Sequence, residues 1–202
     1  MLRVGVLVSG NGTNLQALLD AQAAGVLGAR VVVVGCNRAD ARALERARAA
    51  GVAVCLADRT QIRKRIERQA LLRAALLEAR VDLVVLAGFD EILTPELVST
   101  FAGRIVNTHP SLLPAFGGTM HAVRAALEHG VKVSGCTVHL VTDKLDGGPI
   151  LDQRAVPVLD GDTEETLHRR ILEQEHLLLP LTVRAFAEGR LALPRPAVYV
   201  SA

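Results

Sequence analysis

The sequence predicts a single α/β domain with a Rossmann-like sheet, mixed but mostly parallel, and helices on both of its faces. In the first half of the chain, short apolar runs alternate with longer segments of helical period, which indicates βαβ crossovers. In the second half, two strand-like runs are separated by a segment too short for a crossover, which indicates an antiparallel hairpin. A length of 202 residues supports one core and is short for two, so residues 1–202 are expected to form one domain.

Four strands and three helices are expected in the first half. One helix is expected between Asp40, as its cap, and Gly51, which would end it. The other two predicted helices cover residues 14–24 and 63–79, and the second of them is an amphipathic segment rich in Arg and Leu. The predicted strands cover residues 2–8, 31–36, 52–56 and 83–86.

The pattern changes after residue 103. A fifth strand is expected over residues 104–107, followed by a segment, His109–Pro114, in which two prolines forbid regular structure. Residues 133–140 and 150–156 form the predicted hairpin. The last helix is expected to start at a capping-box-like sequence near Asp162 and to run to about residue 187, with a kink at Pro180.

The composition excludes several classes of protein. Four Phe, one Tyr and no Trp cannot form the row of rings that binds single-stranded nucleic acid, and a net charge of +2 disfavours a DNA or RNA binder. No apolar run approaches the roughly 18 residues of a membrane span, and no signal peptide is evident. Three widely spaced cysteines favour buried thiols in a reducing compartment. We therefore expect a cytoplasmic protein, a monomer or homodimer, whose partners are small molecules and not nucleic acid or membrane.

A glycine-rich turn, Ser9–Asn14, lies between the first predicted strand and the first predicted helix. It is similar to the start of a dinucleotide-binding fingerprint, but Leu15 takes the place of the third glycine and the second strand ends in Cys36-Asn37-Arg38, without the acidic residue that binds a ribose. Glycines permit a tight bend, and a helix N-terminus attracts phosphate. A plain structural turn is the alternative. We interpret the turn as a site for a phosphomonoester.

Two further segments carry side chains suited to catalysis. Asn107 and His109 are two residues apart on an extended segment, so they point the same way. An amide donor suits a developing oxyanion, and an imidazole accepts protons near neutral pH. Asp146, in the turn between the hairpin strands, could orient that imidazole. The alternatives are a loop histidine satisfied by backbone and an ordinary Asp-Gly turn. The six histidines show no metal-ligand spacing, so no metal is predicted.

Taken together, these segments resemble the folate-dependent formyltransferase family, and the resemblance extends over residues 4–193. The patterns Asn-x-His-Pro-Ser-Leu-Leu-Pro and Asp-x-Gly-Pro-Ile are specific to this family. The segments that carry it are Ser9–Gln16, Leu86–Phe89, Asn107–Pro114, Thr137–Gln153 and Glu175-His176.

The resemblance implies direct transfer of a formyl group from 10-formyltetrahydrofolate to the amine of glycinamide ribonucleotide, a step of de novo purine biosynthesis. It implies neither a metal nor a covalent enzyme intermediate. Asn107, His109 and Asp146 would be the catalytic trio. Groups implied for the ribonucleotide are Gly12, Thr13, Asn14 and Arg65 for the phosphate and Glu175 for the ribose. Groups implied for the pterin are Phe89, Ile92, Leu93, Val98, Ile105, Val141, Thr142 and Asp143.

The sequence departs from the family pattern at Asp90-Glu91, where the family often has Met-Arg, and the two acids put the usual contacts to the folate's own glutamate in doubt. A formyltetrahydrofolate hydrolase or a tRNA formyltransferase-like enzyme is the nearest alternative. We expect neither, because both carry an additional domain and lack a reason for this phosphate loop. The alternative of another class is a non-catalytic nucleotide-binding module. Such a module would need the glycine-rich turn, but it would have no use for Asn107, His109 and Asp146 lying close together.

Overall fold

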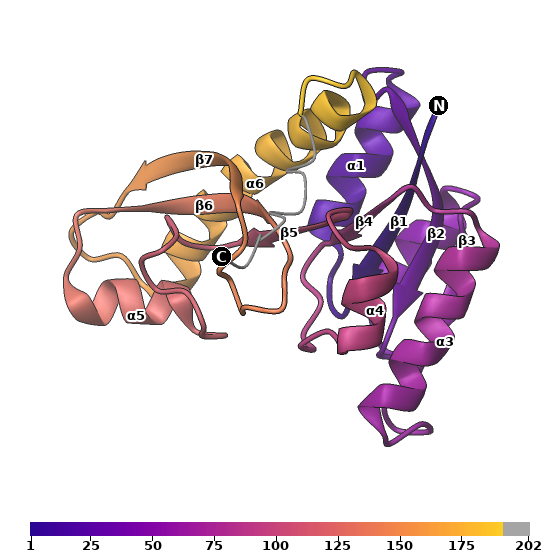
Figure 1. The fold of residues 1–202 in the computed structure, drawn as a ribbon. Helices are drawn as coiled ribbons and strands as arrows, with labels where there is room; N and C mark the ends of the chain where they lie inside the picture. Colours follow the sequence, from indigo (N-terminus) through magenta and orange to yellow (C-terminus); the bar gives the residue numbers. More distant parts are fainter. Residues whose placement is uncertain (192–202) are drawn as a thin grey trace, which may run out of the picture.

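The computed structural model describes residues 1–191, and within that range seven strands form one sheet covered by six helices (Figure 1). The strand order is β3-β2-β1-β4-β5-β6-β7. The strands are β1 (Leu2–Val8), β2 (Ala29–Cys36), β3 (Ala53–Leu56), β4 (Leu83–Leu86), β5 (Ile105–His109), β6 (Val133–Leu140) and β7 (Ile150–Pro157). The helices are α1 (Thr13–Ala23), α2 (Ala43–Ala49), α3 (Arg65–Glu78), α4 (Pro95–Thr100), α5 (Ala122–His129) and α6 (Glu164–Ala187).

The sheet has a parallel half and an antiparallel half, as the sequence predicts. Strands β1 to β5 pair in parallel, whereas β6 pairs antiparallel with both β5 and β7. The predicted α/β class is thereby confirmed. The expectation of one domain over residues 1–202 extends to residues 192–202, which lie outside the described range.

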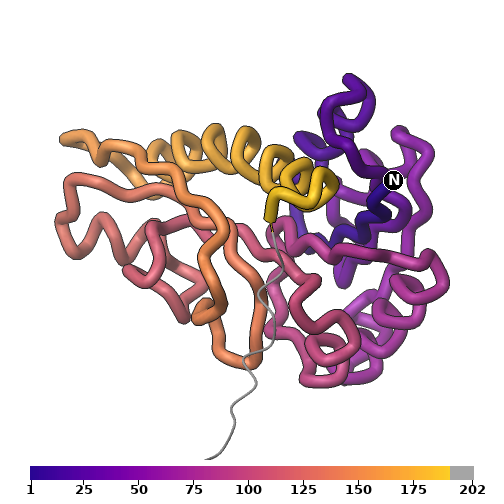
Figure 2. Tube along the Cα trace, turned by 45° about the horizontal axis from the view of Figure 1, so that its top comes forward, coloured from indigo at the N-terminus to yellow at the C-terminus, as the bar shows by residue number. Residues whose placement is uncertain are grey.

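Two apolar cores lie on opposite faces of the sheet, because neighbouring residues of a strand point to opposite sides. On one face, Val6 belongs to a core shared with α1, α2 and α6, and on the other, Leu7 belongs to a core shared with α3 and α4. Helix α6 packs against β6 and β7 and reaches α1 (Figure 2). The longest helix thus holds the hairpin and the parallel strands together.

Some element boundaries differ from the prediction. Helix α4 was not predicted, because its six residues, capped by Thr94, are too few to show helical periodicity. Asp40 does not cap α2, because α2 begins three residues later and Asp40 pairs with Arg38 at 3.2 Å. Strand β5 continues to His109, two residues beyond its predicted end. Helix α6 includes Pro180 and ends at Ala187, as predicted.

The order of the strands locates the site. After β1 the chain moves outward to β2 and β3, and it then returns to the other side of β1 to form β4. Ligands of open α/β sheets bind at such a switch point, beyond the carboxyl ends of the strands. Here the segments that follow β1 and β4 are joined by a hydrogen bond, which the Ser9 amide donates to the Gly88 carbonyl at 3.0 Å. The Ser9–Asn14 turn and the polar end of β5 therefore lie at the expected edge.

Candidate active site

The polar end of β5 carries two of the three predicted catalytic side chains. Asn107 and His109 lie on the same side of this strand, and their partners in β6 are His139 and Thr137. His109 is buried, with 6% of its surface exposed. The strand pairing therefore fixes the spacing of these side chains.

Asp146 joins them from the turn between β6 and β7. Its Oδ2 lies 3.6 Å from Nδ1 of His109 and accepts a hydrogen bond from the Gly118 amide at 2.8 Å. Asp146 has a φ of 49°, a left-handed conformation that costs free energy in a non-glycine residue. A side chain at Gly148 would overlap the Leu140 carbonyl, so only glycine permits this turn. The structure thus brings the predicted trio together.

The His109 ring is held on both sides. Its Nε2 lies 3.0 Å from the Phe116 carbonyl, which can only accept, so Nε2 donates. Its Nδ1 faces the Asp146 carboxylate. Nδ1 is therefore the ring nitrogen with a free lone pair, and it lies beside a carboxyl group.

A fourth polar side chain, His139, belongs to the same cluster and was not among the predicted site residues. Its Nε2 lies 3.1 Å from Nδ2 of Asn107 and 3.7 Å from Oδ1 of Asp146. Burial lowers the pKa of His139, against smaller opposing contributions from the Leu140 carbonyl and from Asp146. The signal in the sequence was the alternation of β6, which places His139 and Thr137 on one face.

The trio opens into a cavity of about 810 Å³. Ligand cavities are typically of this size, mostly apolar, with a few convergent polar groups. Here Asn107, His109 and Asp146 are among the polar groups. Seven of the eight residues predicted for the pterin line the cavity: Phe89, Ile92, Leu93, Val98, Val141, Thr142 and Asp143.

The eighth, Ile105, does not line the cavity. It points to the same side of β5 as Asn107 but lies two residues earlier, where it is fully buried in the core that includes Leu97 of α4 and Phe101, the residue that follows this helix. Because α4 was not predicted, nothing in the local pattern indicated that Ile105 would be buried under this helix. The lining of the cavity therefore gives no support to the predicted contact of Ile105 with the pterin, which stays a prediction.

The glycine-rich turn leads into α1 through Gly12, which has a φ of 73°. A Cβ at this position would lie 2.7 Å from Cβ of Ala43, so both the conformation and the close approach of α2 require glycine. Gly12 offers no side-chain cap to α1. The amides of the first helical turn, which have no partner within a helix, are available to an anion.

Asn14 connects this turn to α6. Its Nδ2 donates a 2.6 Å hydrogen bond to the Glu175 carboxylate, and both side chains are buried. Burial raises the pKa of Glu175, and the hydrogen bond from Asn14 opposes that effect. Oδ1 of Asn14 is buried and has no hydrogen-bond partner among the described residues. Polar groups of two predicted ribonucleotide-binding residues therefore meet here.

The arginine that contacts the turn is Arg46 of α2. It donates to the Asn11 carbonyl at 2.9 Å and to the Gln16 side chain at 3.0 Å. Arg65, the predicted phosphate ligand, is exposed at the start of α3, and no hydrogen bond or ion pair in residues 1–191 joins it to the turn. Its predicted role has no contact to support it.

Comparison with known proteins decides the family. A family model described as "Formyl transferase" matches residues 2–183. The chain belongs to this formyl transferase family. The expectation raised by the sequence motifs is thus confirmed over nearly the whole described range.

Named relatives place the chain within the formyl transferases. It is 44% identical over 201 residues to the phosphoribosylglycinamide formyltransferase of Escherichia coli, covering 98% of this chain and 93% of that protein. It is 51% identical over 185 residues to the enzyme of that name from Mycobacterium tuberculosis, covering 92% and 85%. The crystal structure of glycinamide ribonucleotide transformylase 1 from Symbiobacterium toebii superposes with a TM-score of 0.91 at 54% identity, covering 95% and 90%. The predicted enzyme class, a phosphoribosylglycinamide formyltransferase, is confirmed.

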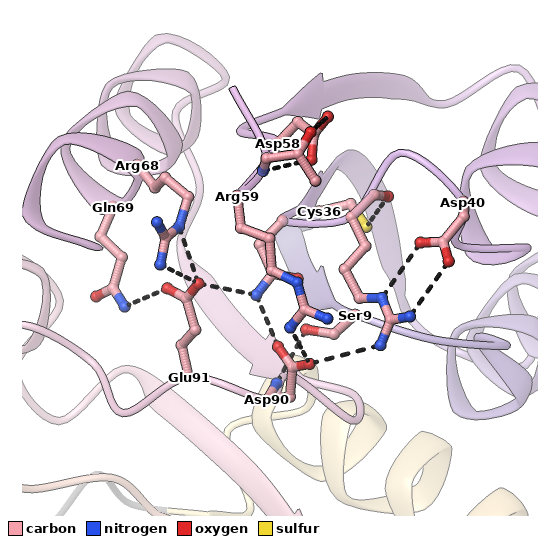
Figure 3. Close-up of polar contacts among 12 residues, drawn as sticks. Ser9, Cys36, Asp40, Asp58, Arg59, Arg68, Gln69, Asp90 and Glu91 are labelled. Atoms are coloured by element: carbon pink, nitrogen blue, oxygen red, sulfur yellow. Dashed lines mark hydrogen bonds and ion pairs between the residues drawn. The ribbon is translucent and has the colours of Figure 1, made fainter. Parts of the chain in front are cut away.

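The two acidic residues that depart from the formyl transferase pattern are both paired (Figure 3). Glu91 accepts two hydrogen bonds from the guanidinium group of Arg68, at 2.6 and 2.9 Å, and each side chain is only 9% exposed. Asp90 accepts from Arg59 at 3.2 Å, and Asn37 donates to both acids. These acids therefore fix one wall of the cavity and do not form a free negative patch.

Two further properties concern residues 1–191 only. Among them, no three His, Cys, Asp or Glu side chains are grouped so that they could hold a metal ion. No helix in this range combines the length and the apolar composition needed to span a membrane.

Proposed function

We propose that this formyl transferase transfers the formyl group of 10-formyltetrahydrofolate directly to the primary amine of glycinamide ribonucleotide, with Asn107, His109 and Asp146 as its catalytic residues. The observation that carries the proposal is the convergence of these three side chains in one cavity of about 810 Å³. The names of the relatives support the choice of substrates. The geometry of the site supports the choice of catalytic residues.

Attack on the formyl group needs an oxyanion donor. The amine nitrogen forms a bond to the formyl carbon, and the π electrons of the carbonyl move onto its oxygen. Asn107 has a second N–H on Nδ2, beyond the one directed at His139, that can donate to this oxygen. A donor already in place stabilises the developing charge without reorganisation.

The attacking amine also carries a surplus proton. His109 accepts that proton, directly or through an ordered water, and Asp146, 3.6 Å away, stabilises the resulting imidazolium. The tetrahedral intermediate then collapses as the oxygen lone pair re-forms the carbonyl. The bond from carbon to N10 of the folate breaks, its electron pair stays on N10, and N10 takes up a proton. One proton is lost and one gained, so the reaction balances without a metal or an enzyme-bound intermediate.

The two substrates would occupy different parts of the site. The pterin would lie in the cavity against Phe89, Leu93 and Val141, which give it an apolar surface with backbone polar groups at its edge. The phosphate of the ribonucleotide would lie on the amides that follow Gly12, and a ribose hydroxyl would bind at Glu175.

The test is an assay of the purified chain with 10-formyltetrahydrofolate in the presence and absence of glycinamide ribonucleotide. We expect folate turnover only with the ribonucleotide and a formylated product in equal amount. Turnover without the ribonucleotide would favour the hydrolase alternative. Tight binding of the ribonucleotide without any turnover would favour the binding module. The cytoplasmic location and the monomer or homodimer state stay predictions.

A further inference from the structure

The clearest unexplained feature of the site is His139, a fully buried histidine, 1% exposed, that the mechanism above does not use. It lies opposite Asn107 in the antiparallel pairing of β5 and β6. Its ring makes two hydrogen bonds, one on each nitrogen. The charged and titratable groups near it are Asp146 and His109.

The tautomer of His139 follows from its surroundings. Nδ1 lies 2.9 Å from the carbonyl oxygen of Leu140, and a carbonyl oxygen can only accept, so Nδ1 carries the hydrogen. Burial disfavours a charged ring. A neutral ring protonated at Nδ1 has a lone pair at Nε2, and Nε2 therefore requires a donor.

The atom that faces this lone pair belongs to the side-chain amide of Asn107, at 3.1 Å. An amide has a donating end and an accepting end of nearly the same shape, so packing alone does not select between its two orientations. The Nε2 lone pair attracts the NH₂ group and repels the oxygen. The orientation of Asn107 is thus set by a hydrogen bond rather than by its own packing.

We propose that His139 is a positioning residue whose Nε2 lone pair holds the NH₂ end of Asn107 toward the reacting carbonyl. This inference rests on the proposed function, because it assigns a purpose to the second N–H of Asn107. Without His139, the amide is free to present its oxygen to the developing oxyanion, which would repel it. The rate of the chemical step falls accordingly, whereas none of the contacts proposed above for either substrate involves His139.

Kinetics of three variants test the role. We expect His139→Leu to lower kcat by about 10- to 100-fold, less than the ~10²–10³ that follows loss of an oxyanion donor. Because the interaction acts in the transition state, kcat and kcat/KM should fall together. His139→Gln, which can place an amide oxygen near the position of Nε2, should recover part of that loss. In an Asn107→Ala background, His139→Leu should cost little more, since the group that it orients is gone.

The controls separate positioning from folding. His168→Leu removes an exposed histidine of α6 and should leave kcat and the melting temperature unchanged. Equal losses from His139→Leu in the parent and Asn107→Ala backgrounds would overturn the proposal, as would a variant whose only change is in KM. Full activity of His139→Leu would overturn it as well.

A measurement that does not need activity distinguishes this proposal from the assigned reaction. In ¹⁵N-histidine-labelled protein, NMR should show His139 as the neutral tautomer with its proton on Nδ1, and Asn107→Ala should shift the Nε2 resonance. A proton on Nε2 or a charged ring at pH 7 would refute the positioning role even in an active enzyme. An inactive protein with the expected tautomer would instead refute the proposed function.

Discussion

The side-chain amide of Asn14 donates a 2.6 Å hydrogen bond to the carboxylate of Glu175, although the two residues are 161 positions apart in the chain. This contact ties the first turn of α1 to the middle of α6, and it lies beside the turn where the phosphate is proposed to bind. Glu175 is 4% exposed and would be costly to bury as a charge without this partner. A carboxylate kept in such a place is well suited to bind hydroxyl groups of a ligand.

Replacing Glu175 tests both its ligand role and its cost to stability. Glu175→Gln should raise KM for the ribonucleotide about 10- to 100-fold, the value of one or more hydrogen bonds to a charged group. Because burial raises the pKa of Glu175 in the folded protein above its ordinary value of 4.5, the parent loses stability as the pH rises from 4.5 through the folded pKa. The glutamine of the variant has no ionisable group at position 175, so this pH-dependent loss of stability is absent.

The melting temperature of Glu175→Gln should therefore increase relative to the parent between pH 4.5 and pH 7. Thermal unfolding at several pH values measures this difference. A difference that stays constant across that range would contradict the raised pKa. An unchanged KM would remove Glu175 from the ribonucleotide site.

Replacing His109 tests the proposed acid–base role. His109→Ala should lower kcat by ~10²–10⁴, the usual loss when an acid–base group is removed. Binding of the ribonucleotide should persist, because its phosphate and ribose are proposed to contact the Gly12 turn and Glu175. Calorimetry of ribonucleotide binding beside the activity assay checks both. A near-normal rate in this variant would exclude His109 from the mechanism.

Two arginines are candidates for supporting the turn where the phosphate is proposed to bind. Arg46 holds the Asn11 carbonyl and the Gln16 side chain, and Arg65 contacts neither. Arg46→Ala should release the turn and raise KM for the ribonucleotide about tenfold, consistent with loss of one or two charge-assisted hydrogen bonds. Arg65→Ala is the matched control and should change KM little. A larger effect from Arg65→Ala would restore the assignment made from the sequence.

Local pattern was sufficient to predict most of this fold. Alternating strand and helix signals define the parallel strands, and the short Asp-Gly-Gly-Pro connection defines the hairpin. The local pattern also singled out Asn107 and His109 on one extended segment and Asp146 in a turn with two glycines, and the resemblance to the formyltransferases implied that these three residues act together. In each case the signal depends on residues close together in the chain.

The remaining features depend on which elements become neighbours. His139 faces Asn107 only because of the register between β5 and β6, which no local signal fixes. Ile105 is covered by α4, and Arg46 reaches the turn because α2 packs against Gly12. Predicting these contacts requires the three-dimensional arrangement, since the same residue types would fit several positions.

Additional glutamates on the folate should not improve its binding. Asp90 and Glu91 line the cavity, and the arginines nearest to them, Arg59 and Arg68, are already paired with these acids. A polyglutamate tail would thus gain no partner from these two guanidinium groups. KM should be measured for 10-formyltetrahydrofolate carrying one glutamate and carrying several. A clear fall in KM with tail length would refute this expectation.

The buried pair of Arg68 and Glu91 should also be important for stability. Glu91→Leu would leave the guanidinium group of Arg68, 9% exposed, without its charged partner, and breaking such a pair costs about 3–5 kcal/mol. Replacing both residues by leucine should recover much of this loss, because a buried ion pair is often no more stable than apolar side chains of similar volume. Glu67, in the exposed pair with Lys64, is the control, and Glu67→Leu should cost less than about 1 kcal/mol. Urea unfolding of the four proteins gives these differences, and a Glu91→Leu variant as stable as the parent would show that Arg68 finds another partner or reaches solvent.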